Sequence, residues 1–132
     1  MFIRELIVAF AQARLRSCIV GGVAMNLHGV PRMTYDVDVM VAPESAELKK
    51  VETLLGQMGL VRRIPVSLED FADKTYREQM RDERNLIAVT FTDPSNPLRE
   101  VDVLVAPRVD MAEVVDRAVR LVVSGVSTGC VG

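Results

Sequence analysis

Residues 35–41 read Tyr35-Asp36-Val37-Asp38-Val39-Met40-Val41, so that acidic and aliphatic side chains alternate. A period of two is typical of a β-strand with two different faces, here one of valines and one of aspartates. Aspartate is depleted in strands, so two in one short strand indicate a role beyond folding. The Cα atoms of Asp36 and Asp38 are expected about 6.6 Å apart. Both carboxylates can then reach one cation, and Mg²⁺ or Mn²⁺, which prefer oxygen ligands, would relieve their repulsion.

A second acidic strand is predicted over residues 98–105, where Glu100 and Asp102 lie on the face opposite three valines. If this strand lies beside the first one, Asp36, Asp38 and Asp102 converge. Three such carboxylates can hold two metal ions about 3.5–4 Å apart, the arrangement used in phosphoryl transfer. The alternative is that Asp102, with Glu100 on the same face, is one of two solvated acids and is paired with a nearby arginine.

A glycine pair precedes the acids in the chain. Residues 18–20 form a short apolar run that predicts a strand, Gly21-Gly22 follows, and residues 23–27 have helical character. At such a turn the missing side chains let phosphate oxygens approach backbone N–H groups at the start of a helix. Glycine pairs also mark ordinary tight turns, so this pair indicates a phosphate site only together with the acids. Arg32 can supply a cation for phosphate, and Thr34 can donate a hydrogen bond to it or simply turn the chain.

The remaining sequence predicts an α/β (α+β) fold in which a mixed sheet is flanked by helices. Further helices are expected over residues 3–10, 43–58 and 111–119, and further strands over 60–63, 86–92 and 121–123. Residues 93–97 suit a turn between two antiparallel strands. Residues 65–84 are polar and weakly periodic, which predicts a loop with a short helix around residues 68–74. The glycine-rich residues 124–132 are not expected to form a helix.

Length and composition predict a single domain over residues 1–132, either whole or short at its C-terminus. The formal net charge of −2 gives no overall attraction for nucleic acid, although a local basic patch can still bind it. Cys18 and Cys130 lack metal-ligand spacing, and reduced thiols in a cytoplasmic protein are the simplest interpretation. No apolar run suits a membrane span, and residues 1–16 resemble neither a signal peptide nor an anchor.

A cluster of basic residues lies between positions 62 and 84. Such clusters usually form a solvated face, but with an aromatic residue among them they can also track an RNA backbone. The cluster comprises Arg62, Arg63, Lys74, Arg77, Arg81 and Arg84, with Tyr76 as the aromatic residue.

Three separated motifs resemble those of the DNA polymerase β-like nucleotidyltransferase superfamily. Residues 19–22, Ile-Val-Gly-Gly, are similar to its glycine motif, and residues 32–39, Arg-Met-Thr-Tyr-Asp-Val-Asp-Val, to its paired acidic motif. Asp102, in the run Glu-Val-Asp-Val, matches its third acid. The fuller run over residues 21–34 looks most like small bacterial proteins grouped with minimal nucleotidyltransferases and abortive-infection toxins. The resemblance covers about residues 18–105.

The resemblance implies a nucleotidyltransferase fold and the transfer of a nucleoside monophosphate from a triphosphate such as ATP to a hydroxyl of a protein or RNA acceptor. By this resemblance Gly21 and Gly22 contact the triphosphate, Asp36 and Asp38 hold the metal, and Asp102 helps to activate the attacking hydroxyl. A second hypothesis is a catalytically idle module that binds nucleotide or a partner, such as half of a toxin–antitoxin pair, or forms a homodimer. A third is a structural subunit without a ligand.

Overall fold

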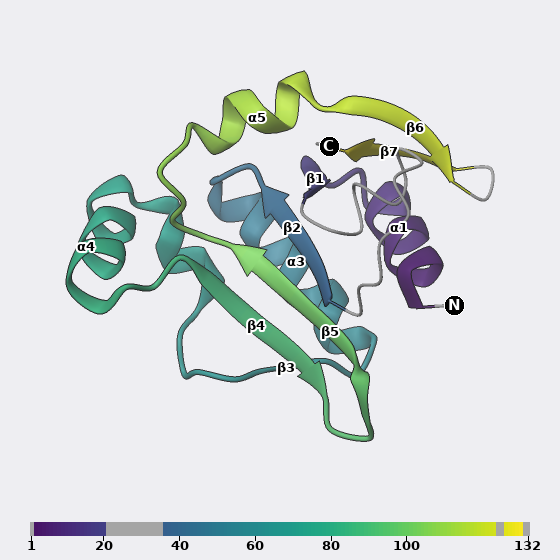
Figure 1. The fold of residues 1–132 in the computed structure, drawn as a ribbon, viewed down its shortest axis with the longest axis horizontal. Coiled ribbons are helices and arrows are strands. Elements are labelled where there is room, and N and C mark those ends of the chain that lie inside the picture. The colour runs from purple at the N-terminus through teal and green to yellow at the C-terminus, as the bar shows by residue number, and fades with distance from the viewer. Residues whose placement is uncertain (1, 21–35, 124–125, 131–132) are drawn as a thin grey trace.

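The computed structural model describes residues 2–20, 36–123 and 126–130, which form a mixed α+β protein (Figure 1). Seven strands make one mixed sheet in the order β3-β4-β5-β2-β1-β7-β6. The helices are α1 (Phe2–Gln12), α3 (Ser45–Gln57), the 3₁₀ helix η1 (Leu68–Ala72), α4 (Lys74–Arg84) and α5 (Met111–Arg117). The strands are β1 (Ser17–Val20), β2 (Asp36–Val41), β3 (Val61–Arg62), β4 (Ala88–Asp93), β5 (Asn96–Leu104), β6 (Val119–Val123) and β7 (Val126–Cys130). The predicted mixed sheet with flanking helices is confirmed at this level.

The centre of the sheet is a parallel pair, β2 and β5, which are far apart in the sequence. On one side β4 forms an antiparallel hairpin with β5, as residues 93–97 predicted. On the other side β1 is antiparallel to β2 and parallel to β7. The two strands that carry the predicted acids are therefore direct neighbours.

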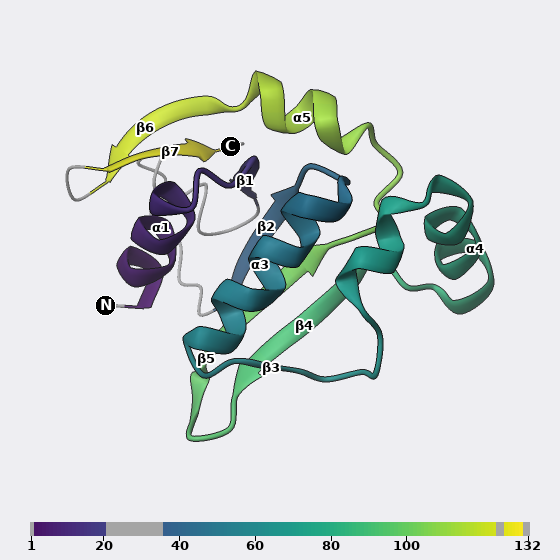
Figure 2. The ribbon, with the colours of Figure 1, turned by 180° about the vertical axis from the view of Figure 1, so that it is seen from behind.

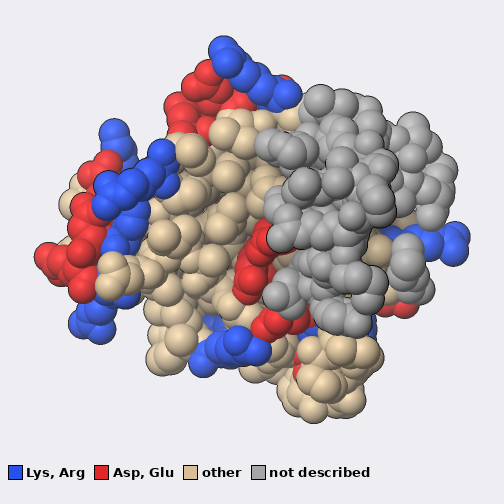
Figure 3. All heavy atoms as spheres, viewed as in Figure 1, with Lys and Arg blue, Asp and Glu red and all other residues tan. Residues whose placement is uncertain are grey.

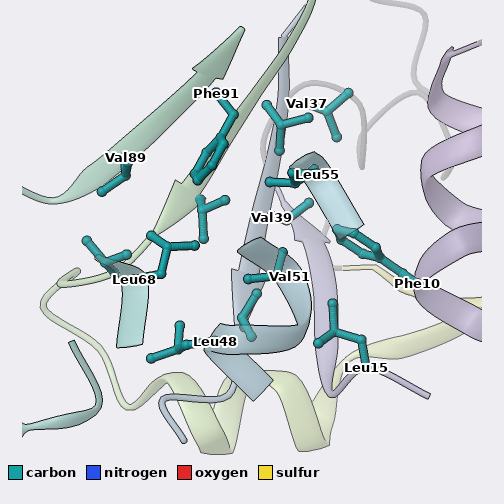
Figure 4. Close-up of a cluster of buried hydrophobic side chains, with 14 of the residues drawn as sticks. Phe10, Leu15, Val37, Val39, Leu48, Val51, Leu55, Leu68, Val89 and Phe91 are labelled. Atoms are coloured by element: carbon teal, nitrogen blue, oxygen red, sulfur yellow. The ribbon is translucent and has the colours of Figure 1, made fainter. Parts of the chain in front are cut away.

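One face of the sheet forms the main core (Figure 4). The odd-numbered valines of β2 and β5 lie on this face, and Val39, Val101 and Val103 have no exposed surface. Helix α3 packs against it with Leu48, Val51 and Leu55, as the view from behind shows (Figure 2). Because the buried valines alternate with the acids, burying the valines places the even-numbered residues on the opposite face.

A smaller apolar cluster lies on that opposite face, at one end of the sheet. It joins Cys18 of β1 and Met40 of β2 to Met111 and Val115 of α5. The Cys18 thiol is buried there and forms no disulfide. In the described part of the chain, α5 therefore packs over the even-numbered face two residues beyond Asp38 on β2.

The short helix predicted around residues 68–74 is confirmed by η1, whereas the loop predicted for the rest of the segment is wrong over residues 74–84, which form α4. Asp73 caps α4, and its carboxylate accepts hydrogen bonds from the backbone N–H groups of Thr75 and Tyr76 at 2.9 and 3.3 Å. Only two apolar side chains of α4, Tyr76 and Met80, pack at the edge of the core. A helix with so few buried residues shows only a weak periodic pattern in its sequence. The capping residue Asp73 is a stronger indication of this helix than the pattern.

Replacing Asp73 by Ala is expected to lower the free energy of unfolding by about 1 kcal/mol, because two N–H groups at the start of α4 lose their acceptor. Urea denaturation measures the change. Asp73→Asn is the matched control, since its side-chain oxygen can still cap the helix. An Ala variant as stable as the Asn variant would contradict the capping role.

Two further elements differ from the prediction: the start of α3 and the tail. The helix expected to begin at Pro43 begins at Ser45, because the chain turns at Pro43 and the Glu44 N–H donates to the Ala42 carbonyl at 2.7 Å. The glycine-rich tail, for which no strand was predicted, contributes β7, which pairs with β6 and with β1. The hairpin partner β6 and the more distant β1 supply the backbone hydrogen bonds that make these residues a strand.

Candidate functional site

Two of the predicted acids lie side by side on the even-numbered face. Asp38 and Asp102 are Cα partners in the parallel β2–β5 pair, and neighbouring strands are about 4.8 Å apart. The expectation that the two acidic strands lie beside each other is thus confirmed. The backbone of Asp36 is in β2, opposite Glu100, whereas its side chain lies outside the described part of the structure.

A threonine on the neighbouring strand holds Asp102. Thr90 of β4 is the Cα partner of Asp102, and its hydroxyl donates to Asp102 Oδ1 at 2.6 Å. A short hydrogen bond from a neutral donor to a carboxylate fixes the orientation of that carboxylate. The sequence did not indicate Thr90, since threonine is common in strands and its partner is 12 residues away.

Glu100 is bound to an arginine. Arg63 Nη2 lies 2.6 Å from Glu100 Oε1, and the glutamate side chain is only 16% exposed. The Arg63 backbone N–H also donates to the Thr90 carbonyl at 2.9 Å, which places residue 63 at the edge of β4. The alternative paired Asp102 with an arginine, whereas in the described contacts the arginine binds Glu100 and Asp102 has a threonine as its partner.

Negative charge is concentrated on this face of the sheet. Asp38, Glu100 and Asp102 occupy adjacent positions of β2 and β5, and Arg63 binds the carboxylate of Glu100. Figure 3 shows acidic atoms on this face at the border of the residues that are not described. Asp38 and Asp102 are both partly exposed, so ligands from solvent can reach them.

The donor set fits a hard divalent cation, because both neighbouring acids offer carboxylate oxygens. Among the described residues, nothing donates a hydrogen bond to Asp102 Oδ2, and Thr90 binds only Oδ1. The described side chains contain no group of three Asp, Glu, His or Cys residues that could form a metal site. Since the Asp36 side chain is not among them, the site of three aspartates stays a prediction.

The predicted phosphate contacts Gly21, Gly22, Arg32 and Thr34 lie outside the described residues. The strand before them is described: β1 ends at Val20, which is the Cα partner of Asp38. In the sequence, Gly21 therefore directly follows the residue that is paired with Asp38.

The six basic residues predicted as one cluster fall into two groups. Arg62 ends β3 and binds Glu52, and Arg63 directly follows this strand and binds Glu100. The other four belong to α4. Tyr76 does not join them in a stacking surface, because its ring packs edge-on against Phe71 with centroids 5.0 Å apart. The interpretation as solvated residues fits Arg63 and Lys74, whose side chains are 60% and 78% exposed, and contact with an RNA backbone stays a prediction.

Comparison of the sequence with protein-family models and with curated proteins finds no match. None of the helices in the described ranges has the length and apolar composition needed to cross a bilayer.

Replacing Thr90 by Val removes the hydroxyl at nearly constant volume and is expected to lower the free energy of unfolding by about 1 kcal/mol. In an Asp102→Ala background the same replacement should cost much less, because the acceptor is already gone. A double-mutant cycle by urea denaturation measures this coupling. Thr90→Ser, which keeps the hydroxyl, is the control. A coupling energy near zero would mean that the hydrogen bond does not hold Asp102.

Proposed function

We propose that the protein is a metal-dependent nucleotidyltransferase with a nucleotidyltransferase fold. The observation that supports it best is the parallel register of β2 and β5, which pairs Asp38 with Asp102. These two carboxylates come from distant parts of the sequence and lie on one face of the sheet. In the family resemblance they match one acid of the paired motif and the third acid. The glycine motif follows β1, the other neighbour of β2.

In the proposed reaction the acceptor hydroxyl oxygen forms a bond to the α-phosphorus of the triphosphate. The bond from that phosphorus to the bridging oxygen breaks, and pyrophosphate leaves with its electron pair. Asp102 Oδ2 accepts the hydroxyl proton, while Thr90 keeps Oδ1 in place. Mg²⁺ or Mn²⁺, when held by Asp38, Asp102 and Asp36, would lower the pKa of the attacking hydroxyl and screen the leaving pyrophosphate.

Calorimetric titration of ATP, GTP, CTP and UTP, each with and without Mg²⁺, tests the proposal directly. Binding that needs Mg²⁺ and is lost in the Asp36→Asn/Asp38→Asn variant is the expected result. Failure to bind any triphosphate in the presence of Mg²⁺ would overturn it. Transfer of a labelled nucleotide to a single acceptor in a lysate would then distinguish an enzyme from a binding protein.

A second candidate is an idle module that binds nucleotide or a partner protein without catalysis. The partners of the acids favour it: Arg63 binds Glu100, and Thr90 binds Asp102, so the protein itself satisfies part of the site. Metal-dependent binding of a triphosphate without transfer to any acceptor would support this candidate.

A further inference from the structure

Acidic residues occupy a block of four backbone positions at the centre of the even-numbered face. Asp36 and Glu100 are Cα partners in the β2–β5 pair, and Asp38 and Asp102 are partners two residues further along it. Cα partners lie about 4.8 Å apart across the strands, and positions two residues apart on one strand lie about 6.6 Å apart. Negative charges at such distances repel one another, so a nearby cation stabilises them.

The strand register places Arg63 on the face that carries these acids. The preceding residue, Arg62 of β3, is the Cα partner of Phe91, whose side chain belongs to the main core. The Arg63 N–H donates to the Thr90 carbonyl at 2.9 Å, which continues this register by one residue. Thr90 is opposite Asp102, so Arg63 lies two strands, or about 9.6 Å, from that acid.

An ion pair connects Arg63 to the acidic positions. Its Nη2 atom lies 2.6 Å from Oε1 of Glu100, which is within hydrogen-bond distance. Figure 3 shows basic atoms over β3 beside acidic atoms. Glu100 is two residues before Asp102, so the bound guanidinium stays within about 10 Å of an ion held by Asp38 and Asp102.

The neighbouring Arg62 carries the same charge on the other side of the sheet. Its Nη1 atom lies 2.9 Å from Oε1 of Glu52, a residue of α3, and α3 packs against the face that forms the main core. The two arginines are adjacent in the sequence, but the alternation of side chains in a strand separates their charges. Of these two charges, that of Arg63 is the one on the side of the acids.

A fixed positive charge at this distance acts in opposite directions on the two forms in which a metal ion can arrive. It repels a bare divalent ion. A complex of that ion with triphosphate carries a net negative charge, so the guanidinium attracts the complex and offsets its repulsion by the acids. At about 10 Å in a solvated site and at low salt, each effect changes the affinity about fivefold.

We propose that Arg63 sets the metal preference of the acid site: paired with Glu100, it weakens binding of the bare divalent ion and favours the metal–triphosphate complex. The proposal rests on the proposed function, for which it names a residue that selects the form of the substrate. Arg63 acts through its charge and needs no contact with the ligand, so its ion pair is part of the role. The pair also occupies Glu100, which is then not a further ligand of the metal.

Arg63→Gln is the variant that tests the proposal, and Arg62→Gln is its matched control, because it removes the same charge from the opposite face. Arg63→Lys keeps the charge and should restore the wild-type behaviour. Arg63→Gln leaves Glu100 without this partner, so Arg63→Gln/Glu100→Gln is added, which removes both charges and keeps the net charge of the site. Thermal unfolding midpoints verify that each variant is folded.

Calorimetry measures two affinities for every variant: that of Mn²⁺ alone, and that of a triphosphate in saturating Mn²⁺. The triphosphate is whichever of ATP, GTP, CTP and UTP the wild type binds most tightly. At about 0.01 M ionic strength, Arg63→Gln is expected to bind Mn²⁺ about fivefold more tightly and the triphosphate about fivefold more weakly. Arg62→Gln and Arg63→Lys should stay within about twofold of wild type in both affinities, as should the double variant with Mn²⁺ alone.

The opposite signs separate this role from a structural one, since a distorted site would lose affinity for both ligands. Both changes should also become smaller at about 0.15 M ionic strength, where the Debye length is about 8 Å. Changes of one sign in both titrations, or equal changes in Arg62→Gln, would overturn the proposal and leave the proposed function standing. Tighter Mn²⁺ binding by Arg63→Gln, with no triphosphate bound by any form, would reject the proposed function and support the restraint of the bare ion by Arg63. If no form binds Mn²⁺ in either titration, both are rejected.

Discussion

Asp38→Asn and Asp102→Asn are each expected to lower nucleotidyl transfer at least about 100-fold and to abolish Mg²⁺-dependent binding of triphosphate. The two carboxylates are Cα partners on neighbouring parallel strands, and each Asn keeps the shape of the side chain while removing its charge. A metal ion contributes several kcal/mol to charge stabilisation in phosphoryl transfer, and each 1.36 kcal/mol corresponds to about a factor of ten in rate. Calorimetry and a labelled-nucleotide assay measure the two losses.

The same variants separate a functional site from a structural one. Like charges held close together destabilise a fold, so removing one of them should leave the free energy of unfolding unchanged within about 1 kcal/mol or raise it. Glu83→Gln on α4 is the matched control, because it removes one exposed negative charge away from the acid pair. Transfer that persists in both Asn variants would reject the catalytic assignment. A large loss of stability would instead indicate a structural role for the pair.

Phe71→Ala is expected to lower the free energy of unfolding by about 3–5 kcal/mol, a large part of the total of about 5–15 kcal/mol typical of a domain. The Phe71 side chain is 0% exposed and belongs to the main core. Its ring contacts Tyr76 edge-on, so its removal also weakens the attachment of α4. The midpoint of urea denaturation, with the slope of the transition, measures the loss.

Phe2→Ala provides the control for this prediction. Phe2 is only partly buried, and the guanidinium of Arg99 lies 4.9 Å from the centre of its ring. Removing this ring should lower the free energy of unfolding by only about 1 kcal/mol. Less apolar surface returns to water than at Phe71, and the contact with Arg99 is partly open to solvent. If both phenylalanine variants were equally stable, Phe71 would not be part of a close-packed core.

The local patterns in the sequence predicted most of the elements that carry the site. Alternation over residues 35–41 and 98–105 predicted both acidic strands and the face that each acid occupies. The same reasoning failed for α4, whose helical pattern rests on two partly buried side chains, and for β7, which is a strand only through its pairing with β1 and β6. α4 packs against η1, which directly precedes it in the sequence, and β7 pairs with its hairpin neighbour β6 as well as with the distant β1.

The partners of the acids could not be read from the sequence. Thr90 reaches Asp102 only because β4 folds back on β5 in one particular register. Arg63 was expected in a basic cluster with α4, and instead it binds Glu100 from beside the edge of β4.

The sequence by itself determined which side of each strand carries the acids, because alternation of side chains is a property of the extended backbone alone. It also supplied the glycine motif and the order of the three aspartates. Only the tertiary structure decided that Asp38 lies beside Asp102. Burying the valine faces of β2 and β5 together against α3 excludes a register shift by one residue, since such a shift would turn the acids into the core.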